Sequence, residues 1–87
     1  MSYQVIIHPD LASGCRKLRS KSPERYEQLK RKIKFLVENP ESGKPLHAPL
    51  KGQWRVHIGH FVLIYEIDTK DRTIILLRLI HHDEAYQ

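Results

Sequence analysis

The chain has 87 residues, of which 40% are hydrophobic, 29% are charged and 8% are aromatic. This length has room for one hydrophobic core, so we expect a single domain over residues 1–87, and the composition excludes a disordered chain. No apolar run is long enough to cross a membrane, and the first residues do not resemble a signal peptide. The lone Cys15 cannot form an internal disulfide, which is typical of a reduced, cytoplasmic protein.

The net charge of +5 is unevenly distributed along the chain. Residues 1–38 contain nine Lys and Arg against four Asp and Glu, whereas residues 39–87 contain six of each and five of the six histidines. The first half is therefore a basic body whose charge stays constant near neutral pH. The second half is neutral, but its histidines can be protonated in that pH range. A basic body favours a nucleic acid or an acidic protein as partner, although a solvated helical surface would have the same composition.

The first half contains the pattern of one strand and two helices. Residues 3–8 are short, apolar and β-branched, which predicts a strand. Pro9-Asp10 then opens a helix that we expect to be short because it contains Gly14. Ser22-Pro23-Glu24 is a strong start signal for a second, amphipathic helix, which Asn39-Pro40 ends. We expect residues 41–49 to form a loop.

From residue 50 onward the hydrophobic period changes to two, which is typical of strands. We expect strands over residues 54–58, 61–67 and 73–80, the first two joined by a type II′ turn with Gly59 and His60 at its centre. The order is β-α-α-β-β-β. It predicts an α+β domain with both N-terminal helices on one face of an antiparallel sheet.

Alternation along the strands assigns side chains to the two faces of this sheet. A two-residue turn pairs His57 with Val62, so both face away from the helices together with Arg55. A connection of three or five residues before the last strand then sets Arg78 opposite Val62 on this open face. The residues expected to face the helices are Trp54, Val56, Ile58, Ile75, Leu77 and Leu79.

The open face therefore gathers groups that suit RNA cleavage without a metal. His82 and Tyr86 are four residues apart and share a face whether the tail is helical or extended. An imidazole can take or give a proton, arginines can stabilise a phosphate as its charge grows, and a tyrosine can stack on a base. These are the requirements for attack of a 2′-hydroxyl on the adjacent phosphate.

Each of these residues also has an ordinary structural interpretation. His57 would be a solvated strand residue, Arg78 would form a salt bridge with Glu66 or Asp68, and Tyr86 would fix the C-terminus. A metal site is disfavoured because neither His57-x-x-His60 nor His81-His82 brings two imidazoles together easily. We expect neither a metal nor another cofactor.

The order and spacing of several motifs resemble the RelE/ParE superfamily of toxins from type II toxin–antitoxin modules, and the YafQ-like branch most. The resemblance covers nearly the whole chain and rests on His8-Pro9, Asn39-Pro40, Pro49-Leu50-Lys51-Gly52-x-Trp54-Arg55-Val56, Gly59, Leu63-Ile64-Tyr65-Glu66-Ile67 and the terminal His-x-x-x-Tyr. It implies the RelE-like microbial RNase fold and a metal-free mRNA endonuclease that acts in the ribosomal A site. It also implies an antitoxin that wraps and silences the toxin.

The resemblance also assigns roles to individual residues. Arg55 and His57 match basic positions of RelE-like members, and Tyr86 matches the aromatic residue that contacts the RNA base. His82 matches a tail histidine of YafQ-like members, and His60 lies where those members have an acidic catalytic residue. Two positions depart from the pattern: Val62 replaces an arginine of RelE-like toxins, and Ala48 replaces a loop histidine of YafQ-like ones.

The sequence thus predicts a ribosome-dependent mRNA endonuclease toxin. His82 would be the leading acid or base, with Arg55 and Arg78 on the phosphate, Tyr86 stacked on a base, and His57 or His60 assisting. The residues expected to contact RNA elsewhere are Lys30, Arg31, Lys34 and Lys51. Two alternatives remain open: a ParE-like gyrase inhibitor without catalytic activity, and a decayed toxin that only binds an antitoxin and regulates transcription with it.

Overall fold

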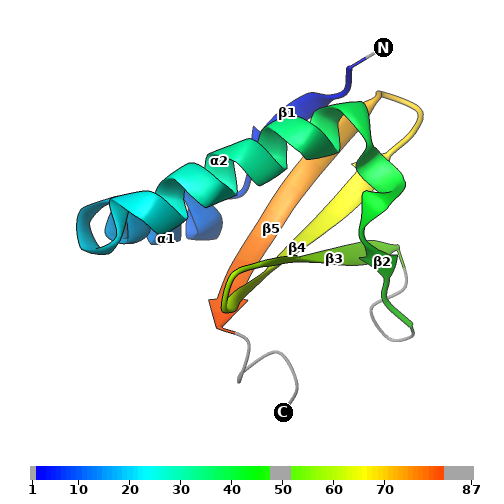
Figure 1. Cartoon of the computed structure of the whole chain (residues 1–87). Helices are drawn as coiled ribbons and strands as arrows, with labels where there is room; N and C mark the ends of the chain where they lie inside the picture. Colours follow the sequence, from blue (N-terminus) through cyan, green and yellow to red (C-terminus); the bar gives the residue numbers. More distant parts are fainter. Residues whose placement is uncertain (1, 48–51, 82–87) are drawn as a thin grey trace.

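The computed structural model describes residues 2–47 and 52–81. Its elements are β1 (Gln4–Ile7), α1 (Pro9–Lys21), α2 (Pro23–Glu38), the short 3₁₀ helix η1 (Pro40–Ser42), β2 (Lys44–Pro45), β3 (Gln53–Ile58), β4 (Phe61–Asp68) and β5 (Thr73–His81). The two long helices lie side by side on one face of a five-stranded sheet (Figure 1). We call this the helix face of the sheet and the opposite one the open face.

The strand order in the sheet is β1-β5-β4-β3-β2. Neighbouring strands are antiparallel except for β1 and β5, which run parallel because the chain crosses back over the sheet through α1 and α2. The predicted α+β fold with two helices on one face is confirmed, and the parallel pair makes the sheet mixed. The loop expected over residues 41–49 contains part of η1 and the two-residue strand β2.

The helices begin where their start signals predicted. His8 caps α1, and its Nδ1 accepts a hydrogen bond from the backbone N–H of Asp10 at 3.2 Å. The helix extends over 13 residues and is longer than Gly14 led us to expect. Its buried Leu11 and the half-buried residues of the same stripe pack against the core, and this packing outweighs the poor propensity of one glycine.

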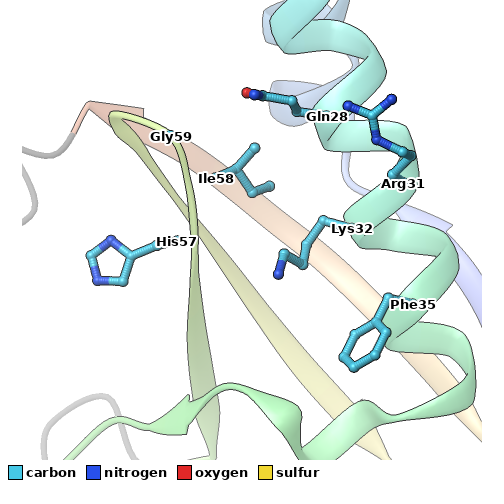
Figure 2. A pocket seen from close by; sticks show the side chains of 7 residues that line it. All are labelled: Gln28, Arg31, Lys32, Phe35, His57, Ile58 and Gly59. Atoms are coloured by element: carbon cyan, nitrogen blue, oxygen red, sulfur yellow. The ribbon is translucent and has the colours of Figure 1, made fainter.

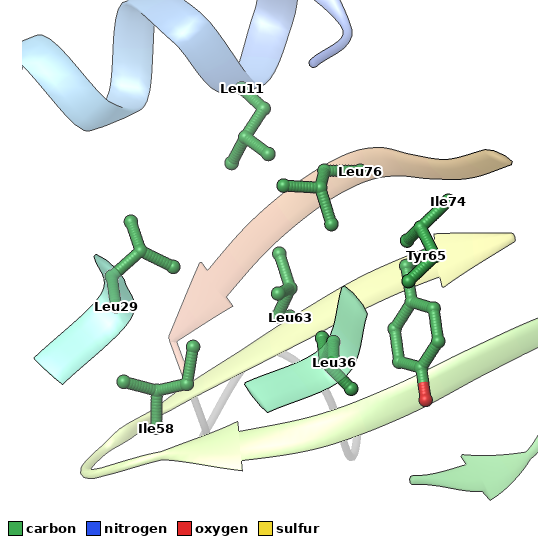
Figure 3. Packing of buried hydrophobic residues seen from close by; sticks show 8 residues of the cluster. All are labelled: Leu11, Leu29, Leu36, Ile58, Leu63, Tyr65, Ile74 and Leu76. Atoms are coloured by element: carbon green, nitrogen blue, oxygen red, sulfur yellow. The ribbon is translucent and has the colours of Figure 1, made fainter. Parts of the chain in front are cut away.

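The hydrophobic core lies between the helices and the sheet (Figure 3). α1 contributes one leucine to it, α2 two leucines, and strands β3, β4 and β5 the remainder. The buried members are Leu11, Leu29, Leu36, Ile58, Leu63, Tyr65, Ile74 and Leu76. Trp54 and Val56 pack against this cluster from β3, so their predicted orientation is confirmed.

The β3–β4 hairpin has the predicted register. Ile58 pairs with Phe61, and His57 pairs with Val62. Gly59 has φ +60°, while His60 is not among the described residues with positive φ. A type II′ turn needs a positive φ at its first central position only, which a glycine adopts without strain. Arg55, His57 and Val62 therefore share the open face, as the alternation indicated.

The β4–β5 hairpin differs from the prediction. Asp68 pairs with Thr73, so residues 69–72 form a connection of four residues rather than three or five. The Asp68 carboxylate accepts a hydrogen bond from the Asp71 N–H at 3.1 Å, and Arg72 adopts φ +52°. This turn reverses the alternation at the start of β5. Ile74 and Leu76 consequently enter the core, and the prediction for Ile75 and Leu77 was wrong.

A β-bulge at Leu77 reverses the alternation a second time. Ile64 pairs with Arg78 while the next residue, Tyr65, pairs with Leu76, which leaves Leu77 as the extra residue. Leu79 then faces the helices as predicted, and Arg78 lies on the open face. The partner predicted for Arg78 was wrong, because the two offsets place it opposite Ile64 instead of Val62.

Candidate functional site

Two arginines lie in one row across the centre of the open face. Arg55 on β3 and Arg78 on β5 are both register partners of Ile64 on β4. Directly opposed residues project from the same face, and two strand spacings put the two Cα atoms about 10 Å apart. Arginine side chains are long enough for both guanidinium groups to contact one phosphate between them. The register of the strands thus supports the prediction that these two arginine side chains meet on the open face.

The surroundings of Arg78 argue against the alternative in which it only forms a structural salt bridge with Glu66 or Asp68. Arg78 is exposed, and within residues 2–47 and 52–81 no carboxylate forms an ion pair with it. Ile64 lies between the two arginines and Val62 lies in the row next to it, and both are apolar and buried, at 5% and 1% exposed. A cation beside a desolvated apolar floor interacts more strongly with an anion than a cation in open water does.

The histidines of the hairpin lie in two different places. His57 is exposed in the row next to Arg55, opposite Val62. His60 lies at the turn, where its ring stacks on that of His81 with 6.5 Å between centroids. His81 also meets the edge of Phe61, which packs beneath Arg25 of α2. Of the two histidines predicted to assist, the geometry favours His57 because it lies beside the arginine row.

A groove separates α2 from the tip of the β3–β4 hairpin (Figure 2). It holds a cavity of about 410 Å³ lined by Gln28, Arg31, Lys32, Phe35, His57, Ile58 and Gly59. A second cavity of about 570 Å³ continues it towards the start of α2 and shares Gln28 and Gly59 with the first. In Figure 2 the Lys32 and Phe35 side chains point towards the hairpin, whereas the His57 ring points away from α2.

The basic residues predicted to contact RNA from α2 are exposed, but they are not equivalent. Lys30 forms an ion pair with Glu27 at 3.1 Å and lies over the Tyr26 ring. Arg31 lines the groove and Lys34 is exposed. We therefore expect Arg31 and Lys34 to contribute more to binding an anion than Lys30, whose charge is partly compensated.

Tyr65 fixes the segment that runs beside Arg55. Its hydroxyl donates a hydrogen bond to the carbonyl of Pro40 at 2.8 Å and accepts one from the N–H of Gly43 at 3.2 Å. Burial raises the pKa of the Tyr65 phenol above its ordinary value, so the group stays a neutral donor. A side chain at Gly43 would collide with the Arg55 carbonyl and the Tyr65 hydroxyl, which explains the glycine. Tyr65 thus holds η1 and β2 against β3.

A third hollow opens on the open face where β1 ends beside β5. It measures about 210 Å³ and is lined by His8, Asp10, Gln53, Leu77 and Arg78. Our sequence interpretation did not assign a role to His8 or Gln53. The alternation that placed Arg55 on the open face also places Gln53 there, and this was the available signal. His8 follows directly after the first strand, but nothing in the sequence pairs that strand with β5.

Three predicted site residues, Lys51, His82 and Tyr86, lie outside the described residues. Among those that the structure describes, no three His, Cys, Asp or Glu side chains gather closely enough to hold a metal ion. No helix in the described ranges is long and apolar enough to cross a bilayer.

Comparison with known proteins places this architecture in the class of small toxins with a RelE-like fold. The family model described as "ParE toxin of type II toxin-antitoxin system, parDE" matches residues 5–86. The chain therefore belongs to this family, and it is a type II toxin of the RelE/ParE superfamily, as its motifs predicted.

Individual relatives are similar to this chain over nearly its whole length. A protein of Methanosarcina mazei is 38% identical over 97% of this chain and 99% of its own. A protein of Methanocaldococcus jannaschii that carries the toxin name RelE4 is 31% identical over 98% of this chain and 92% of its own. Among solved structures, the toxin–antitoxin complex RelBE2 of Mycobacterium tuberculosis has a chain with 27% identity and a TM-score of 0.78, covering 93% of this chain and 99% of that one.

Proposed function

We propose that this toxin is a metal-free, ribosome-dependent mRNA endonuclease that acts in the cytoplasm. The observation that carries the proposal is the row formed by Arg55, Ile64 and Arg78, with His57 in the neighbouring row. Two arginines whose Cα atoms lie about 10 Å apart can place both guanidinium groups on a single phosphodiester. An exposed imidazole beside them suits proton transfer at that phosphodiester.

The proposed reaction is an internal transfer of the phosphoryl group. A base takes the proton of the 2′-hydroxyl, and the 2′-oxygen forms a bond to the adjacent phosphorus. The bond from phosphorus to the 5′-oxygen breaks, and an acid gives that oxygen a proton. The products are a 2′,3′-cyclic phosphate and a 5′-hydroxyl. Arg55 and Arg78 would stabilise the charge that grows on the phosphate oxygens during this step.

His82 is the leading candidate for the acid or base, and Tyr86 for stacking on a base. Both assignments rest on their spacing and on the family resemblance. The variant His82→Ala is expected to fold normally and to abolish growth arrest when the toxin is expressed alone. Undiminished toxicity of this variant would discard the role of His82 but leave the arginine row as the site.

The partners follow from the same proposal. The exposed cations of α2 would contact ribosomal RNA, and this contact should weaken steeply as salt rises. A cognate antitoxin would neutralise the toxin, by analogy with the RelBE2 complex of Mycobacterium tuberculosis. An acidic antitoxin would suit a chain of net charge +5.

Primer extension on translated mRNA after induction of the toxin tests the proposal. We expect new 5′ ends inside open reading frames, and we expect them to disappear when translation initiation is blocked. A variant with both Arg55→Ala and Arg78→Ala serves as the negative control. Intact mRNA in cells whose growth has stopped would contradict the proposal.

A ParE-like gyrase inhibitor is the second candidate, and two observations favour it. The matching family model is that of ParE toxins, and Val62 occupies the place of an arginine of RelE-like toxins. Under this alternative, induction leaves mRNA intact and causes cleaved DNA to accumulate on gyrase. The two products are measured in the same induced culture, so one experiment separates the two functions.

A further inference from the structure

The hollow beside His8 is a compact site with several polar groups. Its volume of about 210 Å³ is smaller than the roughly 300–1,000 Å³ of pockets that enclose a drug-sized ligand, so it suits one planar ring system. It adjoins the proposed phosphate site, because Arg78 belongs both to its lining and to the row with Arg55. A nucleotide held at Arg78 therefore has its own base, or that of its neighbour, within reach of the hollow.

His8 is held in place at the rim of the hollow. Its backbone N–H donates to the carbonyl of Leu76 on β5 at 2.9 Å. Its Nδ1 accepts the N–H of Asp10 at 3.2 Å, and the Asp10 carboxylate lies 3.6 Å from the same nitrogen. Because Nδ1 is an acceptor in this arrangement, the neutral ring carries its proton on Nε2. His8 thus offers one oriented N–H donor.

Gln53 brings a hydrogen-bond acceptor that lacks a partner. Its side-chain Oε1 is buried, and no donor among the described residues reaches it. A buried acceptor without a partner is costly, and a native structure that keeps one commonly has a use for it. An N–H group of a ligand in the hollow would satisfy this oxygen.

The remaining lining residues define which ligand fits. Leu77 is the extra residue of the β5 bulge and gives the hollow an apolar wall. The Asp10 carboxylate disfavours a phosphate inside the hollow and is a second acceptor for N–H groups. An apolar wall, two acceptors and the donors of His8 and Arg78 match the face and the edge of a nucleobase.

We propose that this hollow binds a nucleobase that carries an exocyclic amino group, with Gln53 accepting a hydrogen bond from that group. The inference rests on the proposed endonuclease function and adds a basis for sequence preference to it. Adenine presents both an amino donor and a ring acceptor on one edge, and a glutamine side chain can pair with both. Uracil presents a carbonyl where the amino group is needed and leaves Gln53 Oε1 without a partner.

Binding is tested without cleavage by using 2′-O-methyl trinucleotides, in which the attacking hydroxyl is blocked. The ¹⁵N-labelled protein is titrated with the adenosine, purine riboside and uridine trimers, and NMR shifts give both the affinity and the site. We expect the adenosine trimer to bind about tenfold more tightly than the other two, the discrimination typical of one good base contact. Its largest shifts are expected at the Gln53 side-chain amide and at Arg78.

Two variants test the residues themselves. Gln53→Met on β3 is expected to remove the tenfold preference, whereas Gln4→Met is expected to keep it, because Gln4 is the first residue of β1 and the hollow lies beyond the last. Asparagine is a good helix cap, so His8→Asn should preserve α1 while it weakens binding of the adenosine trimer. An unchanged melting temperature separates this loss from unfolding.

The outcomes also distinguish this inference from the proposed function. A preference for the adenosine trimer with shifts in the hollow, but no cleavage of mRNA, supports the site and overturns the endonuclease. Cleavage on ribosomes overturns the inference if Gln53→Met leaves the cut sites unchanged. The inference also fails if the trimers bind equally, bind in the groove beside α2, or do not bind.

Discussion

Arg78 is the residue whose position depends most on the details of the fold. The turn after β4 and the bulge in β5 each shift the strand by one residue, and together they set Arg78 on the open face opposite Ile64. A guanidinium that grips a phosphate contributes about 1.5–3 kcal/mol per charge-assisted hydrogen bond. This is enough to affect cleavage strongly while leaving the core untouched.

We therefore expect Arg78→Ala to slow cleavage by roughly 10- to 100-fold, since 1.4 kcal/mol corresponds to a factor of ten. Arg78→Lys should recover only part of the rate, because an ammonium cannot form the two-pronged contact of a guanidinium. The rate of appearance of cut mRNA on programmed ribosomes measures both effects. Arg16→Ala, an exposed arginine on the far side of the molecule, is the control. Equal losses in both alanine variants would show that only net charge matters.

Tyr65 gives a prediction about stability. Tyr65→Phe removes the hydroxyl that bonds to Pro40 and Gly43 and leaves both of these half-buried groups without that partner. We expect the free energy of unfolding to fall by about 1–3 kcal/mol in urea titrations. Because the pKa of the phenol is raised in the folded state, its stabilising effect is complete below the unfolded pKa of about 10 and is lost as the pH rises through the higher pKa of the folded state. The difference between wild type and variant should therefore shrink at strongly alkaline pH.

At the scale of elements, α2 contributes both to the hydrophobic core and to the positive charge of the surface. Leu29 and Leu36 attach it to the core, and the cations of its other side face solvent or the groove. The combined variant Arg31→Ala and Lys34→Ala should reduce ribosome binding. It should also lower the slope of log affinity against log salt by roughly 1.4–1.8, which is about 0.7–0.9 for each of two phosphate contacts.

A matched pair on α1, Arg16→Ala and Lys17→Ala, removes the same charge from residues that are also exposed. Binding titrations at several salt concentrations compare the two double variants. If α2 docks on RNA, only the α2 pair changes the slope. The same change in both pairs would mean that ribosomal RNA attracts the positively charged protein as a whole, without a preferred binding surface.

The bulge in β5 leads to a prediction about chain length. Removing Leu77 would turn β5 into a regular strand in which Ile74, Leu76 and Leu79 still face the helices and Arg78 still faces away. We expect this deletion to cost about 1–3 kcal/mol in urea unfolding and to preserve the pairing of Arg78 with Ile64. Removing Leu63 from the regular strand β4 should unfold the protein, since every following side chain changes face. A folded Leu63 deletion would contradict this explanation.

For the whole molecule, stability limits what activity measurements can show. A domain of 87 residues is expected to have a total stability of about 4–13 kcal/mol, and its core consists of few side chains. Leu36 is fully buried between α2 and the sheet (Figure 3), so Leu36→Ala should cost about 2–5 kcal/mol. We expect this variant to lose toxicity through unfolding, which a urea titration detects. It is the reference that any loss at Arg55 or Arg78 must be compared with.

The sequence predicted the arrangement of elements well because strong local signals mark them. Pro9, Pro23 and Gly59 each fix the backbone at the start of a helix or at a turn, and α2 has a clear helical period. The detail of β5 was not predictable in the same way. Its residues 74–77 are all apolar, so either face could be the buried one and the bulge leaves no trace in the pattern.

The candidate site was predictable to the same extent as the strands that carry it. Arg55 and His57 follow from the register of one tight hairpin, whereas the partner of Arg78 depended on the unpredicted bulge. His8 and Gln53 were missed because their proximity arises from the pairing of β1 with β5, which joins distant parts of the chain. The roles of Lys51, His82 and Tyr86 remain predictions from spacing and resemblance.

The bulge at Leu77 has a consequence for relatives of different length. A strand with one extra residue can lose that residue without changing the face on which the following side chains lie. A related chain that lacks the residue can therefore present the same guanidinium on the same face of the sheet. A single-residue gap between Asp68 and Arg78 in a pairwise comparison is thus compatible with an unaltered binding surface. Only the loss or gain of the arginine itself would mark a change in what that surface can hold.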